Sequence, residues 1–277
     1  MEIITLASLL GWGILVGIVF SAIGAAGGIL TSFGLITLFG VSDPNSVKPM
    51  TQIIVLITAL VFVPGYLKRR ALVAPLGLLL GLGGLAGAWA GSTVSSLYLA
   101  DMSSFRPMFG LLALAIGGQI VWKLVRGRAK GANAAPAAVT GHRFTAAAHH
   151  FCCGETTYRI PTWSPLLAGF AIAFVAAIFG VGGGFLLVPY MASLLVMPMY
   201  IIPATAAIAI FMSLGVSISN FIALGAPIDI ALLIPLASGA VIGALLGPLI
   251  NRRAKNSWLQ GALALVVIGI GLKYVLF

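Results

Sequence analysis

Long apolar segments alternate with short polar or glycine- and proline-rich turns along almost the whole chain. A helix that crosses the roughly 30 Å hydrocarbon core of a bilayer needs about 20 mainly apolar residues. Ten segments are candidates for such helices: 3–24, 27–41, 50–66, 72–97, 106–125, 163–180, 183–198, 203–224, 228–250 and 257–277. Segments 27–41 and 183–198 are short and directly follow glycine clusters, so they either cross completely or form half-helices or re-entrant segments.

The amino-acid composition supports a membrane protein and excludes the soluble classes. Hydrophobic residues make up 61% of the 277 residues, charged residues make up only 7%, and the mean hydropathy is +1.16. Soluble domains carry about 25% charged residues, and a globule of this size could not bury so much apolar surface. The net charge of +10 comes from basic residues clustered between apolar segments. That pattern is typical of a multi-pass membrane protein and not of a nucleic-acid-binding protein.

The basic residues form three groups that predict the orientation in the membrane. The first group is Lys68–Arg70, the second lies in or beside loop 127–162, and the third consists of Arg252, Arg253 and Lys255. If every segment crosses, all three groups share one side, which the positive-inside rule places in the cytoplasm, with both termini outside. The side of the N-terminus changes if the short segments do not cross. The first apolar run lacks a basic n-region and a small-residue cleavage site, so we expect a membrane helix and no cleaved signal peptide.

The two membrane halves repeat the same landmarks in the same order, which indicates an internal duplication. The pairs are Gly24–Leu30 with Gly180–Leu186, Pro49–Thr51 with Pro203–Thr205, Gly83/Gly87/Gly91 with Gly239/Gly243/Gly247, and Gly110–Leu114 with Gly261–Leu265. We therefore expect membrane repeats at 1–126 and 163–277, joined by a cytoplasmic linker at 127–162. Glycines spaced four residues apart place small residues on one helix face, which predicts closely packed helix seams.

The positions of the charged turns indicate that the two repeats are inverted. A basic turn follows the third segment in the first half, at Lys68–Arg70, but the fourth segment in the second half, at Arg252–Lys255. The turn after the third segment of the second half carries Asp229 instead. Equivalent turns would then face opposite sides of the membrane, as in many secondary transporters. The predicted fold class is an all-α polytopic membrane protein with two inverted-topology repeats of about five helical segments each, including glycine-broken or re-entrant segments.

The sequence offers little for catalysis, so no enzyme activity, metal site or cofactor is predicted. No ionisable residue lies deep inside a predicted span, and Lys48, Arg106 and Lys273 lie near segment ends. The buried carboxylate that commonly relays protons or sodium in pumps is missing. The sequence also lacks a Ser-His-Asp set, a metal-ligand spacing and a phosphate-binding loop with its lysine.

The glycines that interrupt the apolar segments are the first candidate binding groups. They are Gly27 and Gly28 in the first copy and Gly182, Gly183 and Gly184 in the second. Such glycines leave backbone N–H groups uncovered at the start of the next helix, where they attract anions. Tight glycine helix packing would produce the same sequence pattern, so both interpretations stay open.

Four polar side chains complete the candidate site. Thr51 and Thr205 follow the prolines at the openings of their segments, where each either caps its helix or donates a hydroxyl to a ligand. Gln52 and Asn220 are amides inside apolar runs. An unpaired buried amide costs about 1–3 kcal/mol, so each requires a partner, either another helix or the substrate. Neutral donors suit an oxyanion that must leave again, because an arginine would hold it more tightly.

These features resemble the sulfite exporter TauE/SafE family. The resemblance rests on Gly180-Val-Gly-Gly-Gly-Phe-Leu-Leu-Val-Pro189, on the proline–threonine pairs at Thr51 and Thr205, and on the glycine-spaced helices, and it covers nearly the whole membrane chain. It implies a bacterial or archaeal inner-membrane permease for sulfur-containing anions such as sulfite, thiosulfate or sulfoacetate. The first copy departs from the pattern at Ala26 and Phe33, which predicts two unequal half-sites.

Loop 127–162 is the one long polar stretch of the sequence. Residues 127–140 are predicted to be a flexible linker, and the remainder a structured hairpin or lid. The side chains that could ligate a metal are His142, His149, His150, Cys152 and Cys153. Their spacing is not that of a zinc site, because adjacent side chains rarely ligate one ion. A sulfur-relay or redox role for the two cysteines is the alternative to a loop without chemistry.

The sequence as a whole predicts a secondary transporter that moves a small oxyanion by alternating access, and the resemblance to the family implies that this oxyanion contains sulfur. Both glycine interruptions would face each other near the membrane midplane and form one site. An anion channel and a non-transporting membrane assembly or sensor partner are the alternatives. The expected partners are the anionic substrate and the lipid bilayer, with no nucleic acid, and association into a homodimer is left open.

Overall fold

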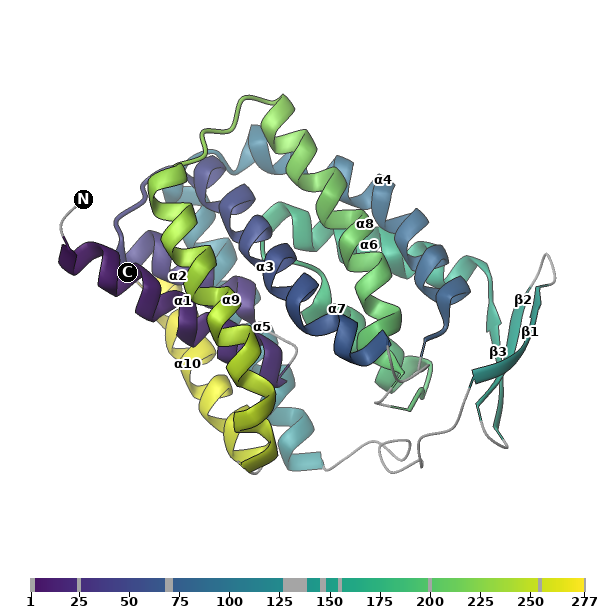
Figure 1. Cartoon of the computed structure of the whole chain (residues 1–277). Coiled ribbons are helices and arrows are strands. Elements are labelled where there is room, and N and C mark those ends of the chain that lie inside the picture. Colours follow the sequence, from purple (N-terminus) through teal and green to yellow (C-terminus); the bar gives the residue numbers. More distant parts are fainter. Residues whose placement is uncertain are drawn as a thin grey trace.

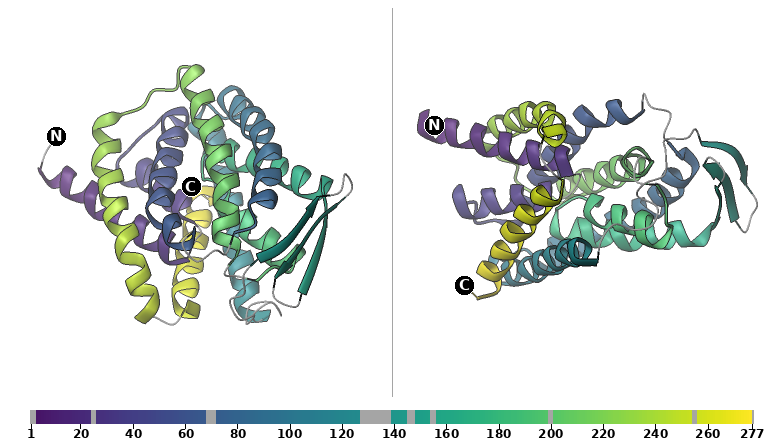
Figure 2. Two further views of the ribbon diagram at one scale, coloured as in Figure 1. Left: turned by 45° about the vertical axis from the view of Figure 1, so that its right-hand side comes forward. Right: turned by 90° about the horizontal axis from the view of Figure 1, so that it is seen from below.

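The computed structural model describes residues 3–23, 26–67, 72–126, 139–144, 148–153, 156–198, 201–253 and 256–276. The helices are α1 (Ile3–Ile23), α2 (Gly27–Phe33), α3 (Pro44–Leu67), α4 (Ala74–Tyr98), α5 (Met102–Arg126), α6 (Trp163–Phe179), α7 (Gly184–Pro189), α8 (Ile202–Ala223), α9 (Ile230–Arg253) and α10 (Asn256–Leu276). Short π-helices, η1 (Gly34–Leu38) and η2 (Tyr190–Leu194), directly continue α2 and α7. The strands are β1 (Val139–Phe144), β2 (Ala148–Cys153) and β3 (Thr156–Pro161). The helices form one bundle with the strands at its edge (Figures 1 and 2).

Five of the described helices are long and apolar enough to cross a membrane. The qualifying stretches are Ile3–Ala22, Ala74–Tyr98, Met102–Val125, Ala204–Ala223 and Ile230–Gly247. The prediction of a polytopic helical membrane protein is therefore confirmed. The apolar helices Gly27–Leu38 and Gly184–Leu194 are much shorter. At 1.5 Å per residue they extend roughly 16–18 Å, about half of the hydrocarbon core, which favours half-helices over complete crossings.

Glycine-rich seams join helices from opposite halves of the chain. Helix α4 packs along α6, and α1 packs along α9. A Cβ atom added to any of three α4 glycines would meet the backbone of α6, and one added to any of three α9 glycines would meet α1. These glycines are Gly83, Gly87 and Gly91 on α4 and Gly239, Gly243 and Gly247 on α9. The predicted packing seams are confirmed, because the helices approach too closely for a side chain to fit between them.

Helix α3 lies near the centre of the bundle (Figure 1). It contacts α2, α8 and α9, while α8 also packs against α4, and α5 packs against α10. The apolar side chains of α3 enter both of the buried hydrophobic clusters, Ile54 joining one and Val55 the other. This central position brings α3 beside the interruptions that precede α2 and α7, where the candidate site residues lie.

A three-stranded antiparallel sheet in the order β1-β2-β3 occupies the described part of loop 127–162. The sequence predicted a structured hairpin or lid here, and the structure adds that it is built from strands beside the otherwise helical fold. Within the described ranges the strands pair with one another and with no other segment, and they sit where β3 leads into α6 (Figure 2). Phe151 and Ile160 are buried in the same hydrophobic cluster as bundle residues, and the Phe151 ring stacks on Tyr158 with 5.1 Å between centroids. These apolar contacts hold the sheet against the bundle.

Candidate functional site

The second chain interruption depends on two glycines with left-handed backbone. Helix α6 ends at Phe179, and Gly180 follows as its C-cap with a φ of 70°. Gly182 has a φ of 75°, and α7 begins two residues later at Gly184. The N–H of Val181 donates to the carbonyl of Ala176, which closes the end of α6. A side chain in this backbone region is strained, so glycine allows the chain to turn from α6 into α7.

The first interruption reaches a similar backbone without glycine at the turn itself. Ala26 has a φ of 63° and precedes α2, which begins at Gly27. For a residue with a Cβ atom, this conformation costs about 1–2 kcal/mol. Gly24 and Ala25 lie outside the described residues. Ala26 stands where the second copy has Gly182, which adopts the same backbone conformation without strain. Only the first copy therefore carries this backbone strain.

The two interruptions contact each other. A Cβ atom on Gly28 would collide with the carbonyl oxygen of Val181, so the start of α2 lies directly against the turn before α7. Gly27 is equally constrained, since an added Cβ atom would lie 2.7 Å from the ring of Phe20. Gly183 is different: the nearest atom to an added Cβ is 3.5 Å away, which is ordinary van der Waals contact. Packing thus requires glycine at 27 and 28 but not at 183.

Gln52 is fully buried on α3, and neither its amide nitrogen nor its amide oxygen has a hydrogen-bond partner among the described residues. Its position follows from two neighbours on the same helix. Gly180 packs against Lys48, four residues earlier, and Gly182 packs against Val55, three residues later. Residues three and four apart share one helix face, so Gln52 lies on the face of α3 that covers the second interruption.

The two threonines of the candidate site have different surroundings. The hydroxyl of Thr51 is buried and lies 3.1 Å from that of Ser32 on α2, so it shares a hydrogen bond with the first half-helix. The hydroxyl of Thr205 donates to the carbonyl of Ile201 at 3.0 Å and accepts the N–H of Val73 at 3.1 Å. Thr205 thus ties α8 to the start of α4, and both of its hydrogen-bonding roles are occupied by protein.

Asn220 belongs to a different part of the bundle. Its side-chain nitrogen donates to the hydroxyls of Ser92 at 2.7 Å and Thr93 at 2.9 Å, both on α4. It follows Thr205 by fifteen residues on α8, a distance of roughly 22 Å along a helix. Of the two alternatives for this amide, the structure supplies the helix partner.

Lys48 was not among the predicted site residues, yet it lies beside them. Its side chain is completely buried, and its ammonium donates to the Asn45 side-chain oxygen at 3.2 Å and to two carbonyls at the end of α4, those of Ser95 at 3.2 Å and Leu99 at 2.7 Å. The sequence pattern placed Lys48 outside the membrane segment predicted at 50–66. In the structure the corresponding helix α3 begins at Pro44 and therefore contains Lys48. Aligning the two repeats could have drawn attention to Lys48. The equivalent position in the second repeat, three residues before Thr205, is occupied by the apolar Ile202.

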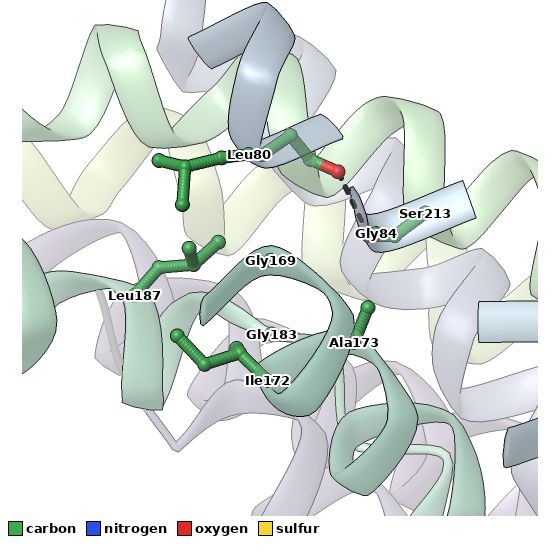
Figure 3. Close-up of a pocket in the computed structure, with 9 residues that line it drawn as sticks. Leu80, Gly84, Gly169, Ile172, Ala173, Gly183, Leu187 and Ser213 are labelled. Carbon is green, nitrogen blue, oxygen red and sulfur yellow. Dashed lines mark hydrogen bonds between the residues drawn. The ribbon is translucent and has the colours of Figure 1, made fainter. Parts of the chain in front are cut away.

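A small cavity adjoins the second interruption (Figure 3). It is enclosed by α4, α6, α7 and α8 and has a volume of about 10 Å³. The lining residues are Leu80, Gly84, Gly169, Ile172, Ala173, Gly183, Leu187, Ala209 and Ser213. The Ser213 hydroxyl is occupied by the carbonyl of Ala209 at 2.8 Å. This space holds at most about one water molecule and its one lining hydroxyl is already bonded, so it is too small to be a preformed oxyanion site.

The histidines and cysteines of the loop do not assemble a metal site in the described part of the chain. No group of three His, Cys, Asp or Glu side chains with metal-binding geometry occurs among the described residues. The side chains of His142, His149 and Cys153 lie outside them. Cys152 and Cys153 are adjacent on β2. The Cys152 sulfur lies 3.6 Å from the hydroxyl of Thr157.

Comparison with known proteins gives the family of this chain. The model of the family described as "Sulfite exporter TauE/SafE" matches residues 9–274. A relative from Bacillus subtilis (strain 168), described as "Probable membrane transporter protein YunE", is 27% identical over 271 residues, which cover 95% of this chain and 94% of the relative. No solved structure matches the chain. The chain belongs to the sulfite exporter TauE/SafE family, a family of membrane transporters.

Proposed function

We propose that this member of the sulfite exporter TauE/SafE family is a secondary transporter that carries a small sulfur-containing oxyanion across a bacterial or archaeal inner membrane by alternating access. Sulfite, thiosulfate and organosulfonates such as sulfoacetate are the candidate substrates. The observation that carries the proposal is the contact between the two interruptions beside the buried amide of Gln52, which has no hydrogen-bond partner in the described part of the chain. A substrate can occupy such an amide, because its hydrogen-bonding groups are not already used by the protein.

The arrangement of the helices supports an inverted repeat. In sequence order, α1, α3, α4 and α5 of the first half correspond to α6, α8, α9 and α10 of the second. The contact of α1 with α9 then corresponds to that of α6 with α4, and the contact of α3 with α9 to that of α8 with α4. In Figure 1, α3 and α8 run in opposite directions, as do α4 and α9. Such repeats are typical of transporters whose substrate site lies between them.

The packing of the helices suggests how the two halves move. Each glycine seam pairs one helix of the first half with one of the second, so α1 moves with α9 and α4 with α6. Relative rotation then occurs between these pairs, at the contact of α3 with α8. The Gln52 amide and the interruption at Gly180–Gly184 lie at this boundary, so rocking would expose the site first to one side and then to the other.

The chemistry at the boundary suits a weakly held anion. An amide side chain donates two hydrogen bonds through its nitrogen, and oxyanions are strong acceptors. Ser32 and Thr51 provide a shared hydroxyl pair on the first half-helix and α3. The half-sites are unequal, because α8 carries Ala206 at the position that corresponds to Gln52. The first half would therefore supply the side-chain donors and the second half the backbone.

Flux through liposomes containing the purified protein tests the proposal. The panel is sulfite, thiosulfate, sulfoacetate, sulfate and chloride, with protein-free liposomes as the control. We expect saturable uptake of at least one of the three sulfur anions and faster uptake when the same anion is trapped inside, as for a carrier. Flux that does not saturate and shows no counterflow would indicate an anion channel. No flux of any anion would indicate a membrane assembly or sensor partner.

A further inference from the structure

Lys48 is the one fully buried charged side chain among the described residues. Its nitrogen has three oxygen acceptors: the side chain of Asn45 and the carbonyls of Ser95 and Leu99. Three acceptors use three N–H donors, which lysine has only as an ammonium ion. The ring of Phe105 on α5 lies 5.2 Å from the same nitrogen. None of these bonded partners is a carboxylate, and Asp43, whose negative charge acts on the ammonium from a distance, makes no ion pair with it.

A buried cation without a directly bonded anion is unfavourable for the fold, even with Asp43 near enough to act on its charge. Moving an ammonium ion out of water carries a large desolvation penalty, which neutral acceptors repay only in part. The second half of the chain shows that an apolar residue suits this position in a helix, because Ile202 occupies it on α8 and is also fully buried. The charge of Lys48 thus needs a reason beyond packing, and a negative ligand would supply one.

Lys48 lies where it can serve such a ligand. It precedes Gln52 by four residues, so the two side chains leave α3 on the same face, about 6 Å apart along the helix axis. The Cα and Cβ atoms of Lys48 pack against Gly180, within 2.6–2.7 Å of where a Cβ atom on that glycine would be. The four-carbon stem of lysine spans a comparable distance and rotates freely about its single bonds. An oxyanion bonded to the Gln52 amide would therefore be within reach of the ammonium.

We propose that Lys48 supplies the positive charge for the oxyanion held at Gln52, and that its ammonium exchanges the carbonyls of Ser95 and Leu99 for that anion. The inference rests on the proposed transport function. A hydrogen bond between an ammonium and an oxyanion is stronger than one to a neutral carbonyl, so the anion competes successfully for the side chain. Loss of the two carbonyl contacts frees the end of α4 from α3.

When the Lys48 ammonium leaves the carbonyls of α4 for the anion, binding of the anion is coupled to movement of α4 relative to α3. In the empty protein, Lys48 joins α3 to the end of α4, and the hydroxyl of Ser95 donates to the carbonyl of Ile178 near the end of α6. Lys48 therefore links α3 to the α4–α6 pair at the C-terminal end of α4, and this link keeps the boundary closed there. An anion that binds better when Lys48 has left α4 shifts the population toward the open form. Substrate binding would release this end of the bundle.

The charge of Lys48 is tested by binding of sulfite and thiosulfate to purified protein, measured by titration calorimetry, and by uptake into liposomes. We expect Lys48→Gln to weaken binding about 10- to 100-fold through loss of a charge-assisted hydrogen bond, and Lys48→Arg to retain more affinity than Lys48→Gln. The matched control is Lys273→Gln, which removes the same charge from an exposed lysine whose ammonium lies 5.7 Å from the ring of Phe33. If Lys48→Gln and Lys273→Gln bind alike, the inference is wrong.

Release of the end of α4 is tested on the wild-type protein by hydrogen exchange. We expect saturating sulfite to accelerate exchange of backbone amides between Ser95 and Met102 by at least about threefold, and Lys48→Gln to show the faster exchange without sulfite. Exchange in the wild type that is unchanged or slower with sulfite would overturn the release of α4. A wild type that neither binds nor transports any anion of the panel rejects the proposed function itself. A wild type that transports sulfite while Lys48→Gln matches the Lys273→Gln control rejects only the inference.

Discussion

Gln52 gives up its hydration on burial and receives no hydrogen bond from the described part of the chain in return. Leaving both polar atoms of an amide unpaired costs about 1–3 kcal/mol. Asn220 has the same functional group but donates to Ser92 and Thr93, so its burial is compensated. The two amides therefore respond differently to removal, although both stand in apolar runs of the sequence.

Replacing Gln52 with leucine should stabilise the protein and impair transport. The apolar side chain removes the unpaired amide, so we expect the free energy of unfolding in detergent to rise by about 1–3 kcal/mol. Loss of the donor should lower the affinity for sulfite about 10-fold or more. Asn220→Leu is the comparison, and it should lower stability without changing affinity. A destabilised Gln52→Leu protein with normal uptake would mean that the amide has a structural partner.

Alanine at two neighbouring glycines separates backbone strain from ligand contact. Gly182 has a φ of 75°, and an added Cβ atom would lie 2.9 Å from Val55, whereas Gly183 has a φ of −74° and room for the atom. We expect Gly182→Ala to lower stability by about 1–2 kcal/mol and Gly183→Ala to change it by less than about 0.5 kcal/mol. If thermal unfolding showed that the two variants lose equal stability, strained backbone at Gly182 would not distinguish it from Gly183. Uptake lost by Gly183→Ala at unchanged stability would support an anion held by the amides at the start of α7.

The close packing of the seam between α4 and α6 can be tested with another pair of glycines. A Cβ atom on Gly87 would collide with the carbonyl oxygen of Phe170, while one on Gly118 of α5 would meet no atom within 4 Å. Gly87→Ala should separate the helices and cost about 2 kcal/mol or more, in the manner of an overpacked core. Gly118→Ala should be neutral or stabilising by up to about 1 kcal/mol, because alanine is the better helix former. Comparable unfolding midpoints for the two variants would contradict the seam.

The sequence predicted the elements whose signal is local. The four-residue spacing of Gly83, Gly87 and Gly91 identified a packing face because that face exists within one helix. The strands of loop 127–162 were missed because three six-residue strands carry little periodicity, and their pairing depends on contacts with each other and with the bundle. Strand pairing of this kind is a tertiary property that a single sequence specifies weakly.

The candidate site shows the same limit. Thr51 and Gln52 could be identified because a polar side chain in an apolar run needs a partner. The partner itself could not be predicted when it came from a distant segment. Lys48 bonds to carbonyls 47 and 51 residues away, and Asn220 to hydroxyls 128 and 127 residues away. Backbone carbonyls also carry no sequence signal, so the environment of Lys48 followed only from the fold.

The charge pattern and the helix directions together predict one orientation of the molecule in the membrane. Helices α3 and α9 both run toward the lower end of the bundle in Figure 1, and the basic groups Lys68–Arg70 and Arg252–Lys255 stand at or just beyond their ends in the sequence. Asp101 and Asp229 precede α5 and α9 at the opposite end (Figure 1). By the positive-inside rule we expect the lower end to face the cytoplasm. Two segments in different positions of their repeats thus share one membrane side, as an inverted repeat requires.

Labelling of single cysteines by a membrane-impermeant maleimide in intact cells tests this orientation. The background is Cys152→Ala with Cys153→Ala, which removes both native cysteines. We expect Arg69→Cys and Arg253→Cys to react only after the membrane is permeabilised, and Asp101→Cys and Asp229→Cys to react in intact cells. Charged turns lie outside the hydrocarbon core, so each of these positions is exposed on one side of the membrane. Normal uptake by the background protein would also show that neither cysteine relays sulfur. Labelling of positions 69 and 253 from opposite sides of the membrane would place the C-terminal ends of the equivalent helices α3 and α8 on the same side. The two repeats would then not be inverted.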